Sequence, residues 1–464
     1  AVLGGADAEA VRQLFRQVAN DGETVRTVRQ LLEEAPSLST VYKEIASNKR
    51  DALKTYLDFI RIVVAGEDPE NFASLASGDD LGVVIDFNGS ARCVSVDRDF
   101  AAQLGLEVRA VNDTPRAIAH QIVPEGAGLG QCCRELEAAH ASNSIYTFGY
   151  VPDNDGDRGN LVYIDDSAVA RPLAAQETFA LACVAELSWL VYTGGLTYSS
   201  EGRADQKVAV VVNGPTSLRL DRIAAAFDAT VFRAEVGEAN VVNLARALRS
   251  RGFIVPILGE GSNGGNITHP STVRDPLATV GAVAKLLVAP ARNGESPFDT
   301  WIRRRGSAGR SFDRTIPGLL ASLPRFKTTS AFESRAKLRI RSTDHGTLKS
   351  EYERIFKRQY RAKKAELGER FGIRSWVVIN YEGTTETHGM GSAFRSGAQR
   401  GGFKVLFKDD VGTPVAFLWM RGSGTEPVFR IMADVEGDSE QDEAFLLDWH
   451  VQMIQQADEN AASA

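Results

Sequence analysis

Short apolar runs that alternate with helical patterns fill residues 81–258 and limit the folds open to this chain. The first run, residues 81–87, is rich in β-branched residues and ends at Asn88-Gly89, which is typical of a buried strand. Five similar runs follow, at residues 107–111, 144–151, 207–212, 229–232 and 253–258. Strands separated by helices favour parallel sheets that helices cover. We therefore expect two α/β units of similar build, with a boundary near residues 194–204.

The two ends of the chain have different patterns. Before residue 72, apolar residues recur at helical spacing in the sets Val11, Leu14, Phe15, Val18 and Leu53, Tyr56, Leu57, Ile60. Residues 293–374 combine helical patterns with clusters of Lys and Arg. Residues 376–435 contain short strands and Gly-rich turns, and a helix follows near residues 445–454.

A chain of 464 residues is too long for one hydrophobic core, and typical domain sizes divide it into about three or four units. The predicted fold class is α/β, with several α/β/α domains that contain mixed sheets and a small C-terminal α+β domain. The predicted units are a helical region at 1–80, α/β domains at 81–195 and 196–293, a basic helical connector at 294–373 and a closing domain at 374–464.

Composition excludes several classes of protein. The content of 43% hydrophobic and 24% charged residues is that of an ordinary soluble globular protein. A net charge of -7 gives no basic footprint for nucleic acid. The most apolar stretch, residues 179–198, is interrupted by Glu186, which favours a buried helix over a membrane span. We expect a cytoplasmic protein with no nucleic-acid or membrane partner, and the oligomeric state stays open.

Three carboxylates follow a predicted strand at alternate positions. Asp153, Asp155 and Asp157 lie in the sequence Asp-Asn-Asp-Gly-Asp-Arg, which we call the carboxylate loop (residues 153–158). Alternate side chains of an extended loop converge, and acidic oxygens with room for water and a phosphate oxygen form the kind of site that Mg²⁺ prefers. Arg158 adds a planar donor group suited to phosphate.

A calcium-binding EF-hand also begins with alternating acidic residues, but the spacing here excludes it. An EF-hand requires Gly at its sixth position and a bidentate Glu at its twelfth. Counted from Asp153, these positions hold Arg158 and Ile164. A solvated acidic turn remains the alternative for this segment taken alone.

Two arginines, two hydroxyl groups and flexible backbone gather near the end of the chain. They form the phosphate loop (residues 421–430), whose candidate ligands are Arg421, Ser423, Gly424, Thr425 and Arg430. Charge-assisted and backbone N–H hydrogen bonds from such a segment surround a phosphate group. A structural turn does not require both arginines together.

A glycine-rich segment lies between these two loops in the sequence. This middle loop (residues 258–267) presents a carboxylate, a hydroxyl and an amide on Glu260, Ser262 and Asn263. Such groups suit the vicinal hydroxyls of a sugar. A plain glycine-rich connection explains the segment equally well when it is considered alone.

The three loops, in this order and about one domain apart, resemble those of the α-D-phosphohexomutase superfamily. Residues 153–158 resemble its magnesium loop, residues 421–427 its phosphate loop, and residues 259–265 the Gly-Glu-Gly-Asn-Gly-Gly variant of its sugar loop. The resemblance implies four domains around a cleft and a Mg²⁺ cofactor. It also implies a sugar phosphate substrate that is converted between its 1- and 6-phosphates through a phosphoserine and a bisphosphorylated sugar.

One family motif is missing from the sequence. The superfamily carries its transferable phosphate on the serine of a Ser-His-Asn-Pro type loop, and no such sequence occurs in the 464 residues. We expect residues 1–80 to be the helical remainder of a first domain in a chain truncated before the serine loop, and therefore inactive. A noncatalytic sugar-phosphate-binding protein of the same fold is the alternative. A third interpretation, a soluble protein with a structural metal turn, leaves Arg421 and Arg430 unexplained. The identity of the hexose stays open among glucose, mannose and an amino sugar.

Overall fold

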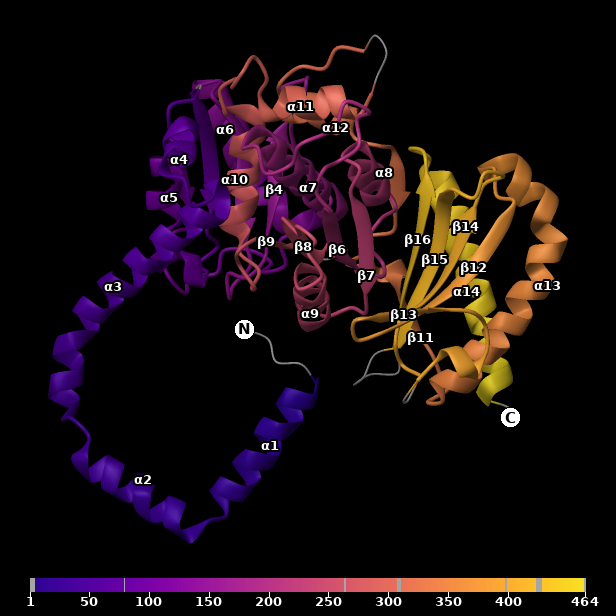
Figure 1. Cartoon of the computed structure of the whole chain (residues 1–464), viewed down its shortest axis with the longest axis horizontal. Coiled ribbons are helices and arrows are strands. Elements are labelled where there is room, and N and C mark those ends of the chain that lie inside the picture. Colours follow the sequence, from indigo (N-terminus) through magenta and orange to yellow (C-terminus); the bar gives the residue numbers. More distant parts are fainter. Residues whose placement is uncertain are drawn as a thin grey trace.

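The structure is a computed structural model that describes residues 5–78, 80–262, 264–306, 310–396, 399–422 and 428–462. The described residues form three sheets with helices around them. Figure 1 shows two sheets in one body and the third, C-terminal sheet beside it. Within the described part of the chain, none of the helices has the length and apolar character needed to span a membrane.

The first sheet carries the carboxylate loop. Its strand order is β2-β1-β3-β4-β5, with the first three strands parallel and the last two antiparallel to their neighbours. The strands are β1 (Leu81–Asp86), β2 (Leu106–Val111), β3 (Tyr146–Pro152), β4 (Gly159–Ile164) and β5 (Ala170–Pro172). Helices α4 (Pro69–Ala76), α5 (Asp97–Gln103) and α6 (Gly130–Ser142) belong to the same part of the chain.

The second sheet carries the middle loop, and its strand order is β7-β6-β8-β9. The strands are β6 (Ala209–Asn213), β7 (Thr230–Ala234), β8 (Ile257–Glu260) and β9 (Gly265–Thr268). The helices that follow or separate them are α8 (Arg219–Ala226), α9 (Glu238–Arg249), α10 (Pro276–Leu287), α11 (Pro297–Arg304) and α12 (Ile316–Ser322).

Helix α7 (Ala175–Tyr192) links the first two sheets and is almost completely buried. It contacts α10, α11 and α8, and also β4, β8 and β9. The buried Lys285 ammonium group of α10 lies 2.6 and 2.7 Å from the two carboxylate oxygens of the buried Glu186 of α7. This pair satisfies two charges that burial alone would disfavour. The buried helix predicted for this apolar stretch is confirmed.

The third sheet has the order β10-β16-β15-β14-β12-β13, and β11 also pairs with β16. Its strands are β10 (Phe326–Thr328), β11 (Lys337–Arg339), β12 (Ser375–Glu382), β13 (Thr385–His388), β14 (Phe403–Lys408), β15 (Pro414–Gly422) and β16 (Val428–Glu436). Helices α13 (His345–Phe371) and α14 (Glu440–Ala462) pack against each other, and their apolar residues share one core with the sheet. Thus two short strands from the basic region before residue 373 belong to the C-terminal sheet.

A buried carboxylate joins the second and third sheets. Asp434 of β16 accepts hydrogen bonds from the Ser217 hydroxyl (2.9 Å), the Leu218 N–H (2.8 Å) and the Thr328 hydroxyl (2.5 Å). Burial raises the pKa of Asp434, because it removes water from the charged carboxylate. The hydrogen bonds at this junction compensate for this desolvation. They fix the C-terminal sheet against the start of α8.

Three helices precede the first sheet: α1 (Gly5–Ala19), α2 (Gly22–Glu34) and α3 (Leu38–Ala65). Figure 1 shows α1, α2 and the start of α3 as an arc that leaves the body, whereas the end of α3 joins it. Phe15, Leu32 and Leu38 are about 70% exposed along the arc, at 71%, 70% and 71%. Ile60 and Val64 near the end of α3 are buried in the core. Short 3₁₀ helices complete the described elements: η1 (Ala91–Val94), η2 (Gly126–Leu129), η3 (Ser334–Ala336) and η4 (Ser392–Phe394).

The predicted α/β class with mixed sheets is confirmed, and one strand begins four residues later than predicted. The pattern predicted a strand from residue 253, but β8 begins at Ile257. Pro256 directly precedes it and has no N–H to donate to a sheet ladder. Before this proline, the predicted strand contributes one isolated bridge, between Ile254 and Val208.

Candidate active site

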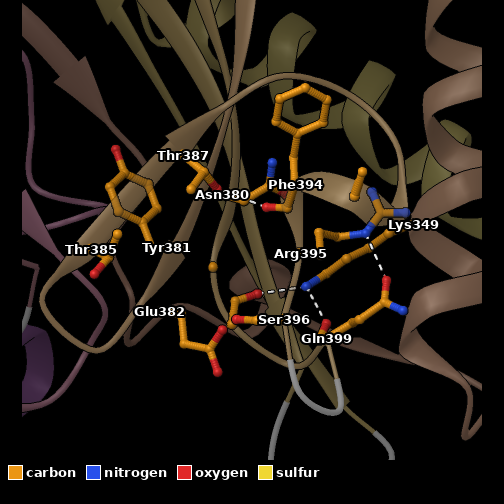
Figure 2. A pocket seen from close by; sticks show the side chains of 13 residues that line it. Lys349, Asn380, Tyr381, Glu382, Thr385, Thr387, Phe394, Arg395, Ser396 and Gln399 are labelled. Atoms are coloured by element: carbon orange, nitrogen blue, oxygen red, sulfur yellow. Dashed lines mark hydrogen bonds between the residues drawn. The ribbon is translucent and has the colours of Figure 1, made fainter.

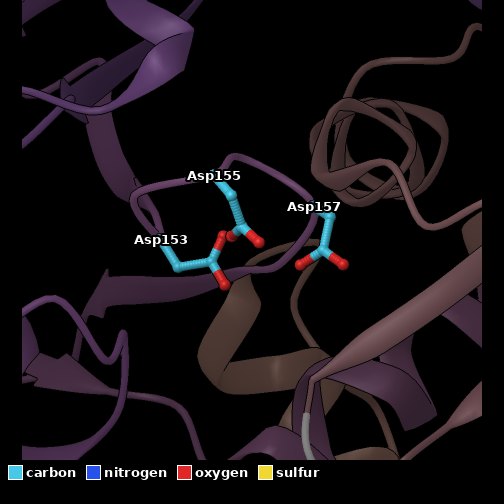
Figure 3. Close-up of side chains that lie close together, drawn as sticks. All are labelled: Asp153, Asp155 and Asp157. Carbon is cyan, nitrogen blue, oxygen red and sulfur yellow. The ribbon is translucent and has the colours of Figure 1, made fainter. Parts of the chain in front are cut away.

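The carboxylate loop connects β3 to β4, where Pro152 and Gly159 are cross-strand partners. Asp153, Asp155 and Asp157 each place a carboxylate oxygen within 4.8 Å of the others. Figure 3 shows the three side chains turned toward the inside of the loop. The predicted convergence of the three carboxylates is therefore present in the structure.

Backbone geometry at Gly156 explains how the loop closes. Gly156 has φ +78°, a left-handed conformation that favours glycine, and a Cβ atom there would lie 2.7 Å from the Arg92 side chain. Arg92 is itself held by Asp97 (2.9 Å) and Asp275 (3.0 Å) and donates to Tyr56 (2.9 Å). The loop thus rests on a buried arginine that joins α3, α5 and the start of α10.

The three carboxylates have different environments. Asp153 is buried and accepts hydrogen bonds from the Gly156 N–H (3.2 Å), the Arg158 N–H (3.1 Å) and Arg158 Nε (2.8 Å). Burial raises the pKa of Asp153, although these donors act in the opposite direction. Asp155 is exposed and Asp157 is half-buried.

The surroundings of the Asp157 carboxylate show whether the three residues fit a cation. Its Oδ1 atom is buried and accepts no hydrogen bond from the described residues, and Arg158 Nε lies 3.6 Å away. This oxygen, which lacks a hydrogen-bond donor, is therefore available as a ligand for a bound cation. Oxygen ligands of this kind are the ones that Mg²⁺ prefers, so the donor set fits such an ion.

Arg158 lies beside the cluster, as predicted, and its Nε atom pairs with Asp153. Arg274, to which the sequence had assigned no role, contributes a second guanidinium group. It pairs with Asp157 and lies 2.9 Å, through Nε, from Glu238 in the first turn of α9. Arg274 therefore ties the carboxylate loop to the second sheet.

The middle loop leaves β8 at Glu260 and returns at β9. Glu260 accepts hydrogen bonds from the Gly237 N–H (2.7 Å) and Asn213 Nδ2 (3.2 Å), and the same Asn213 nitrogen donates to Ser262 (3.0 Å). Glu260 and Ser262 are therefore held side by side. Asn263, the third residue predicted here, lies outside the described residues.

A cavity of about 200 Å³ opens beside Ser262 and reaches residues from all three sheets or their connections. Its lining includes Glu125, Lys327 and Ser330. Glu125 accepts a hydrogen bond from Asn160 (3.0 Å), and burial raises the pKa of Glu125 to about 7. A carboxyl group that titrates near neutral pH is able both to accept and to donate a proton. Sequence reasoning did not single out this residue.

Arg421 and Arg430 of the phosphate loop are cross-strand partners on β15 and β16. Lys337 of β11 lies opposite Arg430 on the other side of β16, so three basic residues form one row on one face of the sheet. Like charges placed directly opposite one another destabilise a sheet unless an anion compensates them. Ser423, Gly424 and Thr425 of this loop lie outside the described residues.

Residues 235–238 contact two of the predicted loops directly and are linked to the third through Arg274. Glu235 lies 3.1 Å from Arg421 Nε, the Gly237 N–H donates to Glu260, and Glu238 pairs with the arginine that holds Asp157. These residues follow β7 and begin α9. Loops that are more than 100 residues apart in the sequence therefore meet around one short segment.

Comparison with known proteins agrees with this arrangement. Residues 194–302, which include the second sheet and the middle loop, match the family model described as phosphoglucomutase/phosphomannomutase, alpha/beta/alpha domain III. Residues 194–302 are therefore similar to the third domain of that enzyme family. None of the curated proteins matches the chain.

Two solved structures share the fold of this chain over most of its length. A phosphoglucomutase/phosphomannomutase family protein from Burkholderia thailandensis is 14% identical, has a TM-score of 0.51 and covers 86% of this chain. The exocytosis-sensitive phosphoprotein pp63/parafusin, a phosphoglucomutase from Paramecium in an open form, is 15% identical, has a TM-score of 0.53 and covers 87%. The chain spans less than two thirds of the length of those two proteins, at 64% and 62%.

Proposed function

We propose that this chain binds a hexose phosphate and Mg²⁺ as part of a phosphohexomutase, an enzyme that interconverts hexose 1-phosphate and hexose 6-phosphate. The observation that carries the proposal is the contact of residues 235–238 with Arg421, Glu260 and, through Arg274, Asp157. An anion-binding arginine, polar groups suited to a sugar and a cation-binding carboxylate set then face one substrate.

Each group has a distinct physical role in this proposal. Asp153, Asp155 and Asp157 would hold Mg²⁺, which supplies neutralising charge for a phosphoryl group during transfer. Arg421 and Arg430, together with Ser423, Gly424 and Thr425, would bind the phosphate group that does not react. Glu260, Ser262 and Asn263 hold the sugar hydroxyls.

The reaction places two demands on such a site. The substrate must bind with either its 1- or its 6-phosphate against the arginines, so the sugar contacts must tolerate both orientations. A bisphosphorylated sugar must also form, which requires a phosphoserine to give and take the phosphoryl group. The 464 residues contain no Ser-His-Asn-Pro type loop, so we propose that they bind substrate without turnover.

The first prediction concerns phosphate binding by the paired arginines. Arg421→Ala and Arg430→Ala should each weaken hexose 6-phosphate binding about tenfold or more. Loss of a hydrogen bond to a charged group costs roughly 1.5 to 3 kcal/mol, and about 1.4 kcal/mol is one decade of affinity. Isothermal titration with glucose 6-phosphate measures the change.

Arg430 gives the cleaner variant, because it is exposed and its hydrogen bond to the Ala331 carbonyl oxygen is long, at 3.3 Å. Arg421→Ala also removes the partner of Glu235, so its fold should be checked by circular dichroism. Arg325→Ala is the matched control, since this exposed arginine pairs with Asp438 (2.8 Å). Unchanged affinity in both arginine variants would contradict the proposed function.

A further inference from the structure

Lys349, in the first turns of α13, is a buried charged residue to which the proposed reaction assigns no role. Its side chain is only 1% exposed, and its Nζ atom donates hydrogen bonds to the carbonyl oxygens of Gln399 (2.5 Å) and Gly401 (2.6 Å). Figure 2 shows the ammonium group reaching from the helix to this turn, at the wall of a cavity of about 310 Å³. Burying an ammonium group is unfavourable unless such acceptors compensate for the lost water.

The turn that Lys349 holds is in contact with the arginine of the phosphate loop through one carboxylate. The Gly402 N–H, next to the bound Gly401 carbonyl, donates to Glu235 Oε2. The other oxygen of Glu235 lies 3.1 Å from Arg421 Nε and accepts from the Val236 N–H (2.7 Å). Three contacts in series thus run from the Lys349 ammonium group on α13 to Arg421.

Close packing makes this series of contacts mechanically stiff. A Cβ atom at Gly401 would lie 2.1 Å from the Tyr381 carbonyl oxygen, and one at Gly402 would lie 2.9 Å from the Trp419 indole nitrogen. The backbone of the turn therefore lies directly against β12 and β15. A small shift of this backbone moves the donor that faces Glu235.

We propose that Lys349 is a positioning residue for phosphate binding, which fixes the turn at 399–402 against Glu235 and thereby sets the orientation of Arg421. The inference rests on the proposed role of Arg421 as a phosphate ligand. It adds to that site a residue on helix α13, which lies 72 positions before Arg421 in the sequence.

The charges around Lys349 give the positioning a pH dependence. The ionisable groups that act on it are Arg395, Glu235, Arg421 and Glu353, and Arg395 itself pairs with Glu353 (2.6 Å). His345 lies on the preceding turn of α13. Burial and, second, the charge of Lys349 lower the pKa of His345. Burial and, second, the charge of Arg395 lower the pKa of Lys349 to about 7.

The direction of the pH effect follows from that shift. Below pH 7 the ammonium form donates to both carbonyl oxygens, and this form is lost as the pH rises through about 7. Phosphate affinity should therefore fall between pH 7 and 9. The second ionisation of a phosphate monoester, near pH ~6, makes the ligand more negative as the pH rises and so acts in the opposite direction.

The experiment is a double-mutant cycle on glucose 6-phosphate binding, measured by isothermal titration at pH 6.5 and pH 9. The variants are Lys349→Met, Glu235→Gln and both together, with Lys363→Met as the control, because Lys363 lies on the same helix and pairs with Glu366 (3.1 Å). Coupling through a packed network changes affinity roughly 2- to 30-fold. At pH 6.5 we expect each single variant to weaken glucose 6-phosphate binding within that range. The fold-loss of affinity in the double variant should be smaller than the product of the two single fold-losses.

Two readouts separate positioning from a general loss of fold. Lys349→Met should abolish the fall of affinity between pH 7 and 9, and its Mg²⁺ affinity should equal that of the unmodified chain, because the carboxylate loop is on a different sheet. Lys349→Arg, which keeps its charge at pH 9, should retain affinity there. The inference would be overturned if the affinity losses of the two single variants simply multiply in the double variant, or if Lys349→Met leaves the pH profile of binding unchanged. If Arg421→Ala weakens binding while Lys349→Met does not, this inference fails and the proposed function stands.

Discussion

Replacing Asp155 by Asn is expected to weaken Mg²⁺ binding about a hundredfold or more. Loss of a partner in the outer shell of a metal site already costs about 10- to 100-fold in affinity, so loss of a direct ligand should cost at least the upper value. Asp155 is the informative position because its side chain is exposed. Asp153, in contrast, accepts three hydrogen bonds that hold the loop itself.

Asp166→Asn is the matched control for this experiment. Asp166 is an exposed aspartate that follows β4 in the same domain, so the substitution changes the net charge equally. Titration calorimetry with Mg²⁺ should show a loss of affinity in Asp155→Asn and none in Asp166→Asn. Equal affinity in the two variants would contradict a cation site at the carboxylate loop.

The 464-residue chain should bind hexose 1-phosphate and hexose 6-phosphate and interconvert neither at a measurable rate. Enzymes accelerate reactions by at least about 10⁶-fold, and in this reaction the covalent relay through a phosphoserine is indispensable. Positioning by Arg421 and charge neutralisation at Asp153, Asp155 and Asp157 have no acceptor for the first phosphoryl group without it. The assay follows product formation with a trace of hexose bisphosphate as primer.

The comparison that decides this prediction uses a polypeptide that adds a Ser-His-Asn-Pro type loop to the same residues. Turnover should appear in that form and be lost again when its serine is replaced by alanine. Robust turnover by the 464 residues alone would mean that the nucleophile is a residue not identified here. Binding without turnover in both forms would favour the noncatalytic alternative.

The parts of the site that the sequence predicted are those that are close together along the chain. The carboxylates of residues 153–158 lie in one loop between two strands, and Arg421 and Arg430 are neighbours because their strands are paired antiparallel in the sheet. Local spacing is sufficient for such groups. Glu260 and Ser262 were predicted for the same reason, because they are near each other in one loop.

The residues that sequence reasoning missed depend on contacts between distant segments. Arg274 reaches Asp157 across 117 positions, and Glu235 lies beside a backbone N–H 167 positions later. Lys349 and Lys337 belong to the stretch interpreted as a basic helical connector, so neither was assigned to the site. Glu125 lies in a segment without periodicity, so only the tertiary fold shows that it borders a cavity next to Ser262.

Fold prediction had a similar limit. Helical and strand periodicity located the long elements, including the buried helix α7 and the strand β1. The three-residue strands β10 and β11 are too short to show any period, and their pairing with β16 decides their structure. Sheet partners across such distances are set by tertiary packing.

A crystal structure of the chain with Mg²⁺ and glucose 6-phosphate tests the convergence of the three loops most directly. The expected result is an ion bound by Asp153, Asp155 and Asp157 with oxygen ligands near ~2.1 Å, and a phosphate group bound by Arg421 and Arg430. The sugar ring should lie between them, in contact with Glu260. A sugar phosphate bound away from both arginines, or an ion bound elsewhere while the three carboxylates point apart, would contradict the proposed site.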